Sequence, residues 1–205
     1  MTIEEELKAF YQKNGFGDAL GSRSRTVPVY TGCMLVPLPN IETGRRFLKY
    51  HDIHHLLTGY SVGRIGEGEV SAWEPGAGSA FISPTLGVMN LVALSTGLVL
   101  KPKRMWHAFQ RGCRSLTLYP ESRRAQVDSG RWQSTDELRG EILESQRTPV
   151  PEALRVVEFG AYSLLAMGVH ACLAIPAVIA RFITDITLGY SVFQAVQPKE
   201  RSDLY

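Results

Sequence analysis

The sequence predicts an all-α protein, a compact helical bundle with a short irregular or β segment near its N-terminus. Three observations predict this class. Apolar residues recur at helical spacing over much of the chain. Capping residues and glycine or proline stops bracket these stretches. Three prolines within residues 26–40 disfavour helical backbone in that stretch. The 205 residues, 44% of them hydrophobic and 20% charged, suffice for one packed core and exclude a disordered chain.

The first helix is predicted over residues 3–13. Thr2 followed by Glu5 matches a capping box, in which a hydroxyl group and a carboxylate satisfy free backbone amides. Apolar residues then recur at helical spacing, and Asn14-Gly15 is a stop signal. Residues 26–40 contain three prolines, so we expect extended or irregular backbone there, with room for a short strand.

Two further helices are predicted on either side of a glycine turn. Asn40 caps the first, which runs over residues 41–58 and ends at Gly59. Ser61 caps the second, which stops at Pro75-Gly76. The turn between them lets the two helices fold back on each other as a hairpin.

The rest of the chain is predicted to be helical as well. The expected elements are an uncharged helix within residues 80–100, a basic amphipathic helix over 105–118, a charged helix near 136–146 and, after a proline linker at 148–151, a long helical stretch over 152–195. We therefore expect a helical core over residues 1–149 that carries the functional motif. Residues 150–205 are expected to form an apolar helical extension packed on the same domain.

Charge is distributed unevenly along the chain. The net charge is only +2, but residues 101–131 hold eight basic residues against two acidic ones. Such a cluster suits a phosphate group, an anionic lipid or an acidic partner, and it equally describes a solvated helix face. Nucleic acid is not an expected partner, because no recognition motif and no interleaved aromatic residues accompany the cluster.

Cysteine usage and the N-terminus indicate the compartment. The three cysteines are odd in number and far apart, which argues against a disulfide framework and against a zinc ribbon. The first residues are acidic and lack the basic start and apolar run of a secretory signal. We therefore expect a protein of the bacterial cytoplasm.

Two stretches carry no charged residue, namely 26 residues from Pro75 to Leu100 and 22 residues from Phe159 to Ala180. A spanning helix needs about 20 apolar residues, so the second stretch barely qualifies and the first is irregular at its start. Three interpretations remain open: helices buried in the core, a surface for a prenyl chain or a membrane, and a transmembrane helix. Small residues in the second stretch also permit the close helix contact of a homodimer.

A set of metal-ligating residue types lies in one window of the chain. Residues 51–55 read HDIHH, and Glu67 follows after eleven further residues. At about 100° per residue, His51, Asp52 and His55 share one arc of a helix, and an apolar residue one turn earlier indicates that this arc faces inward. The glycine turn lets the next helix bring Glu67 opposite the histidines. Two imidazoles and two carboxylates outline a divalent-metal site with room for water or substrate, whereas a solvated helix face is the alternative.

Several generic motifs are excluded. The zinc-protease pattern HExxH needs a glutamate where Asp52 stands, and the zinc deaminases need a Cys-x-x-Cys partner that the chain lacks. Neither a Walker phosphate loop nor a GxSxG nucleophile elbow is present. HD-type phosphohydrolases use a histidine well upstream of their His-Asp pair, and no histidine precedes His51. A phosphohydrolase acting on a prenyl phosphate therefore stays only as a third hypothesis.

The same window resembles a known family. HDxxH followed by eleven residues and a glutamate is the hallmark of the ubiquinone (coenzyme Q) biosynthesis protein four family, and it matches here without a gap at His51, Asp52, His55 and Glu67. Neighbouring residues are similar too, and a weaker resemblance extends over about residues 5–147. Residues beyond 150 lie outside the part that can be matched.

The resemblance implies an all-helical protein that binds a divalent metal (zinc, iron or magnesium) and a polyprenyl lipid or quinone precursor. It implies His51, Asp52, His55 and Glu67 as metal ligands, with Asp52 and Glu67 also as catalytic groups. Two functions remain open. One is oxidative removal of the C1 carboxyl group of the head-group ring, and the other is a non-catalytic lipid-binding scaffold or carrier that organises a quinone-biosynthesis complex.

The order of features along the chain predicts where a lipid tail would bind and where in the cell the protein acts. The metal motif is followed by the first uncharged stretch and then by the basic cluster, which suggests a head-group site, a tail groove and an anionic surface in sequence. Candidate tail-binding residues are Leu86, Met89, Leu91 and Leu94. We expect a cytoplasmic protein, peripheral on the inner face of a bacterial membrane, with other quinone-biosynthesis proteins as partners and a homodimer as its oligomeric state.

Overall fold

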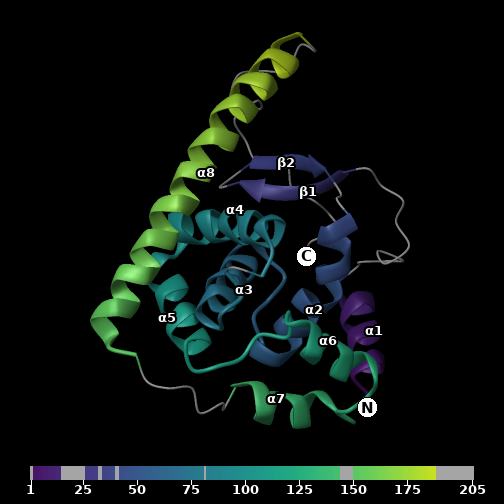
Figure 1. The fold of residues 1–205 in the computed structure, drawn as a ribbon. Coiled ribbons are helices and arrows are strands. Elements are labelled where there is room, and N and C mark those ends of the chain that lie inside the picture. Colours follow the sequence, from purple (N-terminus) through teal and green to yellow (C-terminus); the bar gives the residue numbers. More distant parts are fainter. Residues whose placement is uncertain are drawn as a thin grey trace.

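The computed structural model describes residues 2–14, 26–31, 34–39, 42–80, 82–143 and 150–187. Within them it is helical apart from one antiparallel two-stranded hairpin (Figure 1), which confirms the predicted all-α class with a β segment near the N-terminus. In chain order the elements are α1 (Ile3–Lys13), β1 (Thr26–Thr31), β2 (Met34–Pro39), α2 (Glu42–Thr58), α3 (Arg64–Gly76), α4 (Pro84–Leu100), α5 (Pro102–Gly112), α6 (Glu121–Asp128), α7 (Thr135–Leu143) and α8 (Glu152–Thr187).

The predicted start of α1 is confirmed. The backbone N–H of Thr2 donates to Glu5 Oε2 at 2.8 Å, and the backbone N–H of Glu5 donates to Thr2 Oγ1 at 3.2 Å. These are the two reciprocal bonds of a capping box. The helix ends at Lys13, and the buried residues Ile3 and Leu7 face the core.

The turn between α2 and α3 differs in part from the prediction. Gly59 has φ +75°, a left-handed conformation that favours glycine, so α2 ends at Thr58 as expected. The cap of α3 is Gly63 rather than the predicted Ser61, because the turn continues through residue 63. Pro75 lies in the last turn of α3, which ends one residue later. The predicted cap Asn40, the start of the proline linker and helical residues beyond 187 lie outside the described residues.

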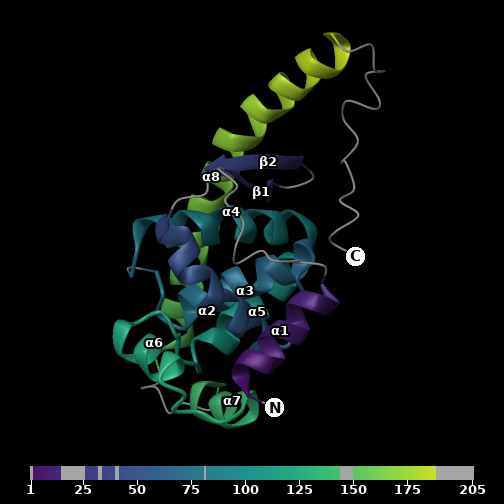
Figure 2. The same cartoon turned by 90° about the vertical axis from the view of Figure 1, so that its right-hand side faces the viewer.

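Helix α3 occupies the centre of the helical body and packs against α4 and α5 (Figure 1). The crossing with α5 is close, since a Cβ atom at Gly112 would lie 2.1 Å from the carbonyl oxygen of Trp73. The hairpin contacts both α4 and α8, and α8 also packs against α4. Figure 2 shows α8 continuing past the hairpin, away from the helical body.

The segment after α5 is not helical as far as predicted. Helix α5 ends at Gly112 instead of near residue 118, and a short helix α6, which was not predicted, follows. Leu118 and Tyr119, between these helices, are fully buried. The backbone N–H of Leu118 donates to His54 Nε2. This N–H group therefore bonds a side chain of another helix rather than a carbonyl group within its own helix.

The two uncharged stretches have different surroundings. The first lies largely in α4, where the predicted lipid contacts Leu86 and Leu94 are buried core residues, while Met89 and Leu91 are partly buried. The second lies in α8, whose side chains are mostly exposed. Among the described residues, one helical stretch, Glu152–Leu173, is long and apolar enough to cross a membrane by length and composition.

Most of the basic cluster makes contacts within the protein. Arg104 pairs with the buried carboxylate of Glu69 through two bonds of 2.7 Å. The other internal contacts are Arg111 to Thr58 O, Arg123 to Thr117 O, Arg124 to Tyr119 O and Arg131 to Glu141. Lys101 and Lys103 are exposed. Two of the eight basic residues, Arg104 and Arg131, are thus paired with carboxylates, and the hydrogen bonds to carbonyl oxygens leave the charge of the other three arginines in place.

Candidate metal site

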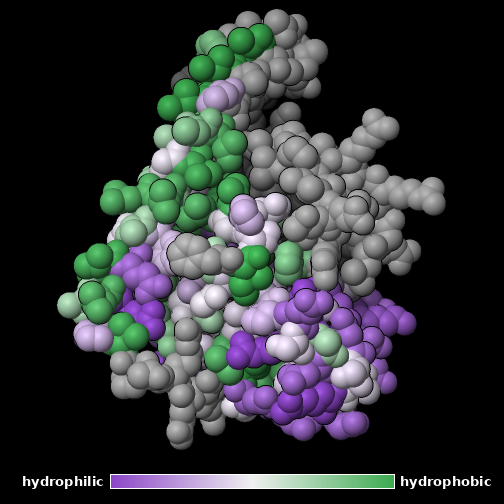
Figure 3. Space-filling model, viewed as in Figure 1, coloured by the Kyte–Doolittle hydropathy of each residue, from purple (hydrophilic) through white to green (hydrophobic). Residues whose placement is uncertain are grey.

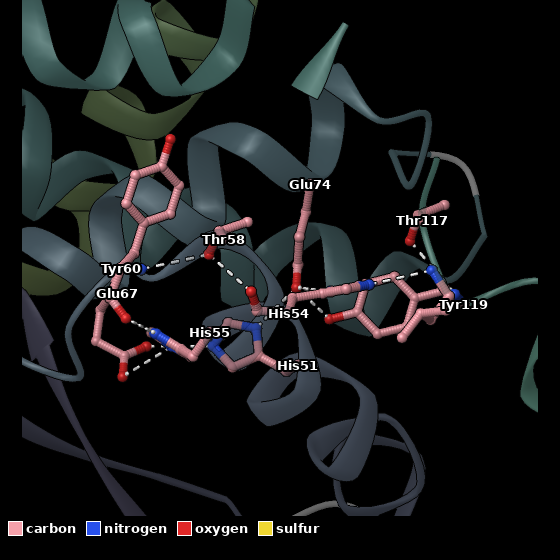
Figure 4. Close-up of polar contacts among 10 residues, drawn as sticks. His51, His54, His55, Thr58, Tyr60, Glu67, Glu74, Thr117 and Tyr119 are labelled. Atoms are coloured by element: carbon pink, nitrogen blue, oxygen red, sulfur yellow. Dashed lines mark hydrogen bonds and ion pairs between the residues drawn. The ribbon is translucent and has the colours of Figure 1, made fainter. Parts of the chain in front are cut away.

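Helices α2 and α3 bring together three residues of the predicted metal site. His51 Nε2 lies 3.2 Å from Glu67 Oε2, and His55 Nε2 lies 3.4 Å from Glu67 Oε1 (Figure 4). One potential ligand atom from each residue lies within 4.8 Å of the other two. The expectation that the turn after α2 places Glu67 opposite the histidines is thus confirmed.

The opposite ring nitrogens fix the tautomers of both histidines. His55 Nδ1 lies 3.0 Å from the carbonyl oxygen of Tyr60, which can only accept a hydrogen bond, so Nδ1 carries a proton. His51 Nδ1 lies 2.9 Å from the carboxylate of Glu74 and is therefore also the donor. Each ring consequently turns Nε2, the nitrogen that can bind a metal when its lone pair is free, toward Glu67.

Two further features fit a metal ion. His55 Nε2 is buried and forms no hydrogen bond within the described residues, which is costly for a buried polar atom. The side chain of Glu67 is 35% exposed, so this third candidate ligand borders solvent and leaves access for water or a substrate. Two imidazoles and one carboxylate with open positions form a donor set that iron and zinc use in enzymes.

The fourth predicted ligand, Asp52, is held apart from this group. Its Oδ2 atom accepts a 2.8 Å hydrogen bond from the hydroxyl group of Tyr11 on α1. Burial raises the pKa of Asp52 to about 6, against the opposing effects of His51 and of the Tyr11 hydrogen bond. Its role as a ligand stays a prediction, and its environment suits a group that takes up a proton.

Glu74 was not among the predicted site residues, yet it bonds the side of the His51 ring that faces away from Glu67. Its Oε1 atom, in a fully buried side chain, lies 2.9 Å from His51 Nδ1 and 2.8 Å from His54 Nδ1, and it accepts a 2.6 Å bond from the Tyr119 hydroxyl group (Figure 4). Glu74 follows Glu67 by seven residues, which is two helical turns on the same face. That spacing was the signal available in the sequence.

His54 belongs to this supporting network rather than to the metal group. Its Nε2 atom accepts a 3.0 Å hydrogen bond from the backbone of Leu118, so its Nδ1 atom is the one that donates to Glu74. Burial lowers the pKa of His54, and both nitrogens are occupied. His54 is therefore a neutral structural histidine.

The charges of the site stabilise one another. Burial alone would lower the pKa of His51, but Glu74 and Glu67 outweigh it and raise this pKa well above its usual range. Burial alone would raise the pKa of Glu67, but His55 and His51 lower it to about 2. Without a metal, His51 is therefore an imidazolium between two carboxylates, and a cation at this point is favoured by the surrounding charge.

Distant segments hold the C-terminal end of α2, where His55 lies. Arg139 of α7 donates to the carbonyl oxygens of Leu57 at 3.0 Å and Leu56 at 2.9 Å. Arg111 of α5 donates to the carbonyl oxygen of Thr58 at 2.7 Å. The last carbonyl groups of a helix lack partners within it, so these arginines satisfy them and fix the turn that carries the Tyr60 carbonyl group.

No family model, no curated protein and no solved structure matches this chain. The resemblance to the quinone-biosynthesis family therefore stays a prediction carried by the motif at residues 51–67. The site itself is defined by its own geometry: two imidazole nitrogens and a carboxylate that converge from α2 and α3.

Proposed function

We propose that this chain is a metal-dependent protein of prenyl-lipid (ubiquinone) biosynthesis that binds a polyprenylated head group at the metal site. The observation that supports this most directly is the convergence of His51, His55 and Glu67, because these residues also belong to the HDxxH-x11-E motif. The proposal includes work at a membrane surface beside other quinone-biosynthesis proteins.

Iron or zinc fits the site better than magnesium, since two of the three converging donors are imidazole nitrogens. Such a metal supplies a Lewis acid or, in the case of iron, a centre for oxygen chemistry. The protein holds His51 and His55 in one tautomer through Glu74 and the Tyr60 carbonyl group. The partly exposed Glu67 leaves a side open for the head group.

The proposed reaction is oxidative decarboxylation at C1 of the head-group ring. The bond between the ring carbon and its carboxyl group breaks, carbon dioxide leaves, and a hydroxyl group takes its place. One atom of dioxygen enters that hydroxyl group, and the other leaves as water after uptake of two electrons and two protons from a reductant. Asp52, with its raised pKa, is the group proposed to accept the proton of the substrate carboxyl group.

The alternative is a non-catalytic lipid-binding scaffold that organises other enzymes. The exposed apolar surface of α8 favours it, because such a surface serves binding without requiring a reaction. Feeding a carboxylated, prenylated ring precursor with dioxygen and a reductant separates the two functions. Release of carbon dioxide that is lost in Asp52→Asn supports the enzyme, and lipid binding without turnover supports the scaffold.

Metal analysis of the purified protein tests the site. We expect about one equivalent of iron or zinc, and a large loss of metal in His51→Ala and in Glu67→Ala. His107→Ala is the matched control, because His107 is an exposed histidine of α5 outside the site. Full metal retention in both site variants contradicts the assignment.

A further inference from the structure

Helix α8 exposes a continuous apolar face. Its 36 residues correspond to a length of about 54 Å. Large apolar residues along it are strongly exposed, with Leu164 the extreme at 77%. At about 100° per residue, six of these residues fall within an arc of about 100°. They are Val157, Leu164, Leu165, Ile175, Ile179 and Ile183.

The opposite side of α8 is the side that packs on the protein. Ala166 is fully buried, the tilted rings of Phe159 and Phe109 of α5 lie 5.2 Å apart between centroids, and His170 Nδ1 lies 3.1 Å from Ser95 Oγ of α4. Only 6% of the most apolar window of α8 is buried. Helix α8 is thus attached by one side and is not a core helix.

The surroundings of α8 point to a lipid bilayer. Between Phe159 and Ala180 the helix has no charged residue, whereas interfaces between soluble proteins carry a polar rim. On the attached side of α8, at the start of this segment, the Trp106 ring of α5 lies 5.3 Å from the Phe159 ring, and the exposed Lys103 precedes Trp106 by one turn, so both lie beside the helix on its protein side. Tryptophan and lysine at the edge of an apolar surface are typical of the headgroup region of a membrane.

The orientation follows from the attachment. Figure 3 shows hydrophobic residues along α8 on one side of the molecule and hydrophilic residues over the region of α6 and α7. If α8 crossed the bilayer, the body beside it would enter the hydrocarbon with its charged surface, which is very unfavourable. A helix that lies in the plane of one leaflet avoids this and still buries its outer face.

We propose that the outer face of α8 docks in the plane of one leaflet of an anionic bilayer, with Lys101 and Lys103 at the headgroups. Residues 159–180, rather than the earlier uncharged stretch in α4, are the membrane-binding part of the chain. This inference extends the proposed function, because the docked face would bring the protein to a lipid substrate in the membrane. The docking itself does not depend on the metal.

Co-sedimentation of the full chain with vesicles tests the proposal. We expect binding to vesicles of phosphatidylcholine with phosphatidylglycerol, and a roughly hundredfold weaker partition for the double variant Leu164→Gln/Ile179→Gln, about tenfold for each side chain. The matched control Leu164→Met/Ile179→Leu keeps the apolar surface and should bind as the parent does. Both pairs should fold, because the side chains are exposed, and thermal unfolding checks this.

A second pair of variants tests the charge. Lys101→Glu/Lys103→Glu should weaken binding to the anionic vesicles several-fold and leave binding to pure phosphatidylcholine unchanged. His51→Ala should bind vesicles like the parent, so loss of the metal site and loss of docking are distinguishable. Equal vesicle binding by the Leu164→Gln/Ile179→Gln variant overturns the proposal. A second contradicting result would come from analytical ultracentrifugation without lipid: a dimer of the parent protein that is lost in this variant. The apolar face would then be the interface between two copies of the chain.

Discussion

Replacing Glu74 by glutamine tests whether the buried carboxylate supports the metal site. Glu74→Gln keeps the size of the side chain and one oxygen acceptor but removes the negative charge. The three candidate ligands, His51, His55 and Glu67, remain unchanged. His51 would lose the carboxylate that holds its Nδ1 proton and orients its ring.

The expected loss of stability follows from the three hydrogen bonds to Glu74 Oε1, whose lengths are 2.9, 2.8 and 2.6 Å. Bonds to a charged acceptor contribute about 1 kcal/mol more than neutral ones, so we expect Glu74→Gln to lower the free energy of unfolding by about 3 kcal/mol. Loss of a carboxylate behind a ligating histidine typically lowers metal affinity about 10–100-fold. The two effects are measured separately.

Glu69→Gln is the matched control, because Glu69 is also a buried glutamate of α3. Glu69 pairs with Arg104, away from the histidines, so we expect a stability loss of about 1 kcal/mol and unchanged metal affinity. Competition with a chromophoric chelator gives the affinities, and urea unfolding gives the stabilities. Equal metal affinities of the two variants would refute a role of Glu74 behind His51.

Three further outcomes are expected. Gly112→Ala should lower the free energy of unfolding by about 3 kcal/mol, because its Cβ would meet the Trp73 carbonyl oxygen at 2.1 Å, whereas Gly140→Ala, with open space in α7, should raise it by about 0.5–1 kcal/mol in the same urea assay. Arg139→Met should cost about 1–3 kcal/mol, because two carbonyl groups at the end of α2 lose their donor; an unchanged urea midpoint contradicts this. Metal binding should release about one proton near pH 7 and strengthen as pH rises, because the raised pKa of His51 leaves its Nε2 protonated until the metal displaces that proton. Calorimetry in buffers of different ionisation enthalpy measures this release, and a heat that is independent of the buffer argues against it.

The elements predicted most accurately are those set by local contacts. The capping box of α1 and the glycine stop of α2 each involve neighbouring residues, so the sequence contains all the partners that matter. The i, i+4 spacing of His51 and His55 is also local, and it places both on one face of α2. The convergence of Glu67 required only a short turn between two helices.

The parts that were missed depend on contacts between distant segments. The helix predicted to residue 118 ends at Gly112, because the backbone of Leu118 is drawn into a bond with His54. The contacts of the basic cluster were not predicted, since partners such as Glu69 and the carbonyl group of Thr58 come from other elements. Glu74 had the right spacing on α3, but only the crossing of α2 and α3 shows which side chains it contacts.

The sequence by itself determined the helical class, the face of α2 that carries the histidines and the existence of two uncharged stretches. Composition cannot distinguish a buried apolar helix from an exposed one, because both lack charge. Only the tertiary packing showed which uncharged stretch is buried and which is exposed. Helix α4 packs between other helices and contributes to the core, while α8 is attached by one side and exposes the other. In the same way, only the hydrogen bonds of the ring nitrogens decided that His51 and His55 face Glu67, while His54 is occupied on both sides.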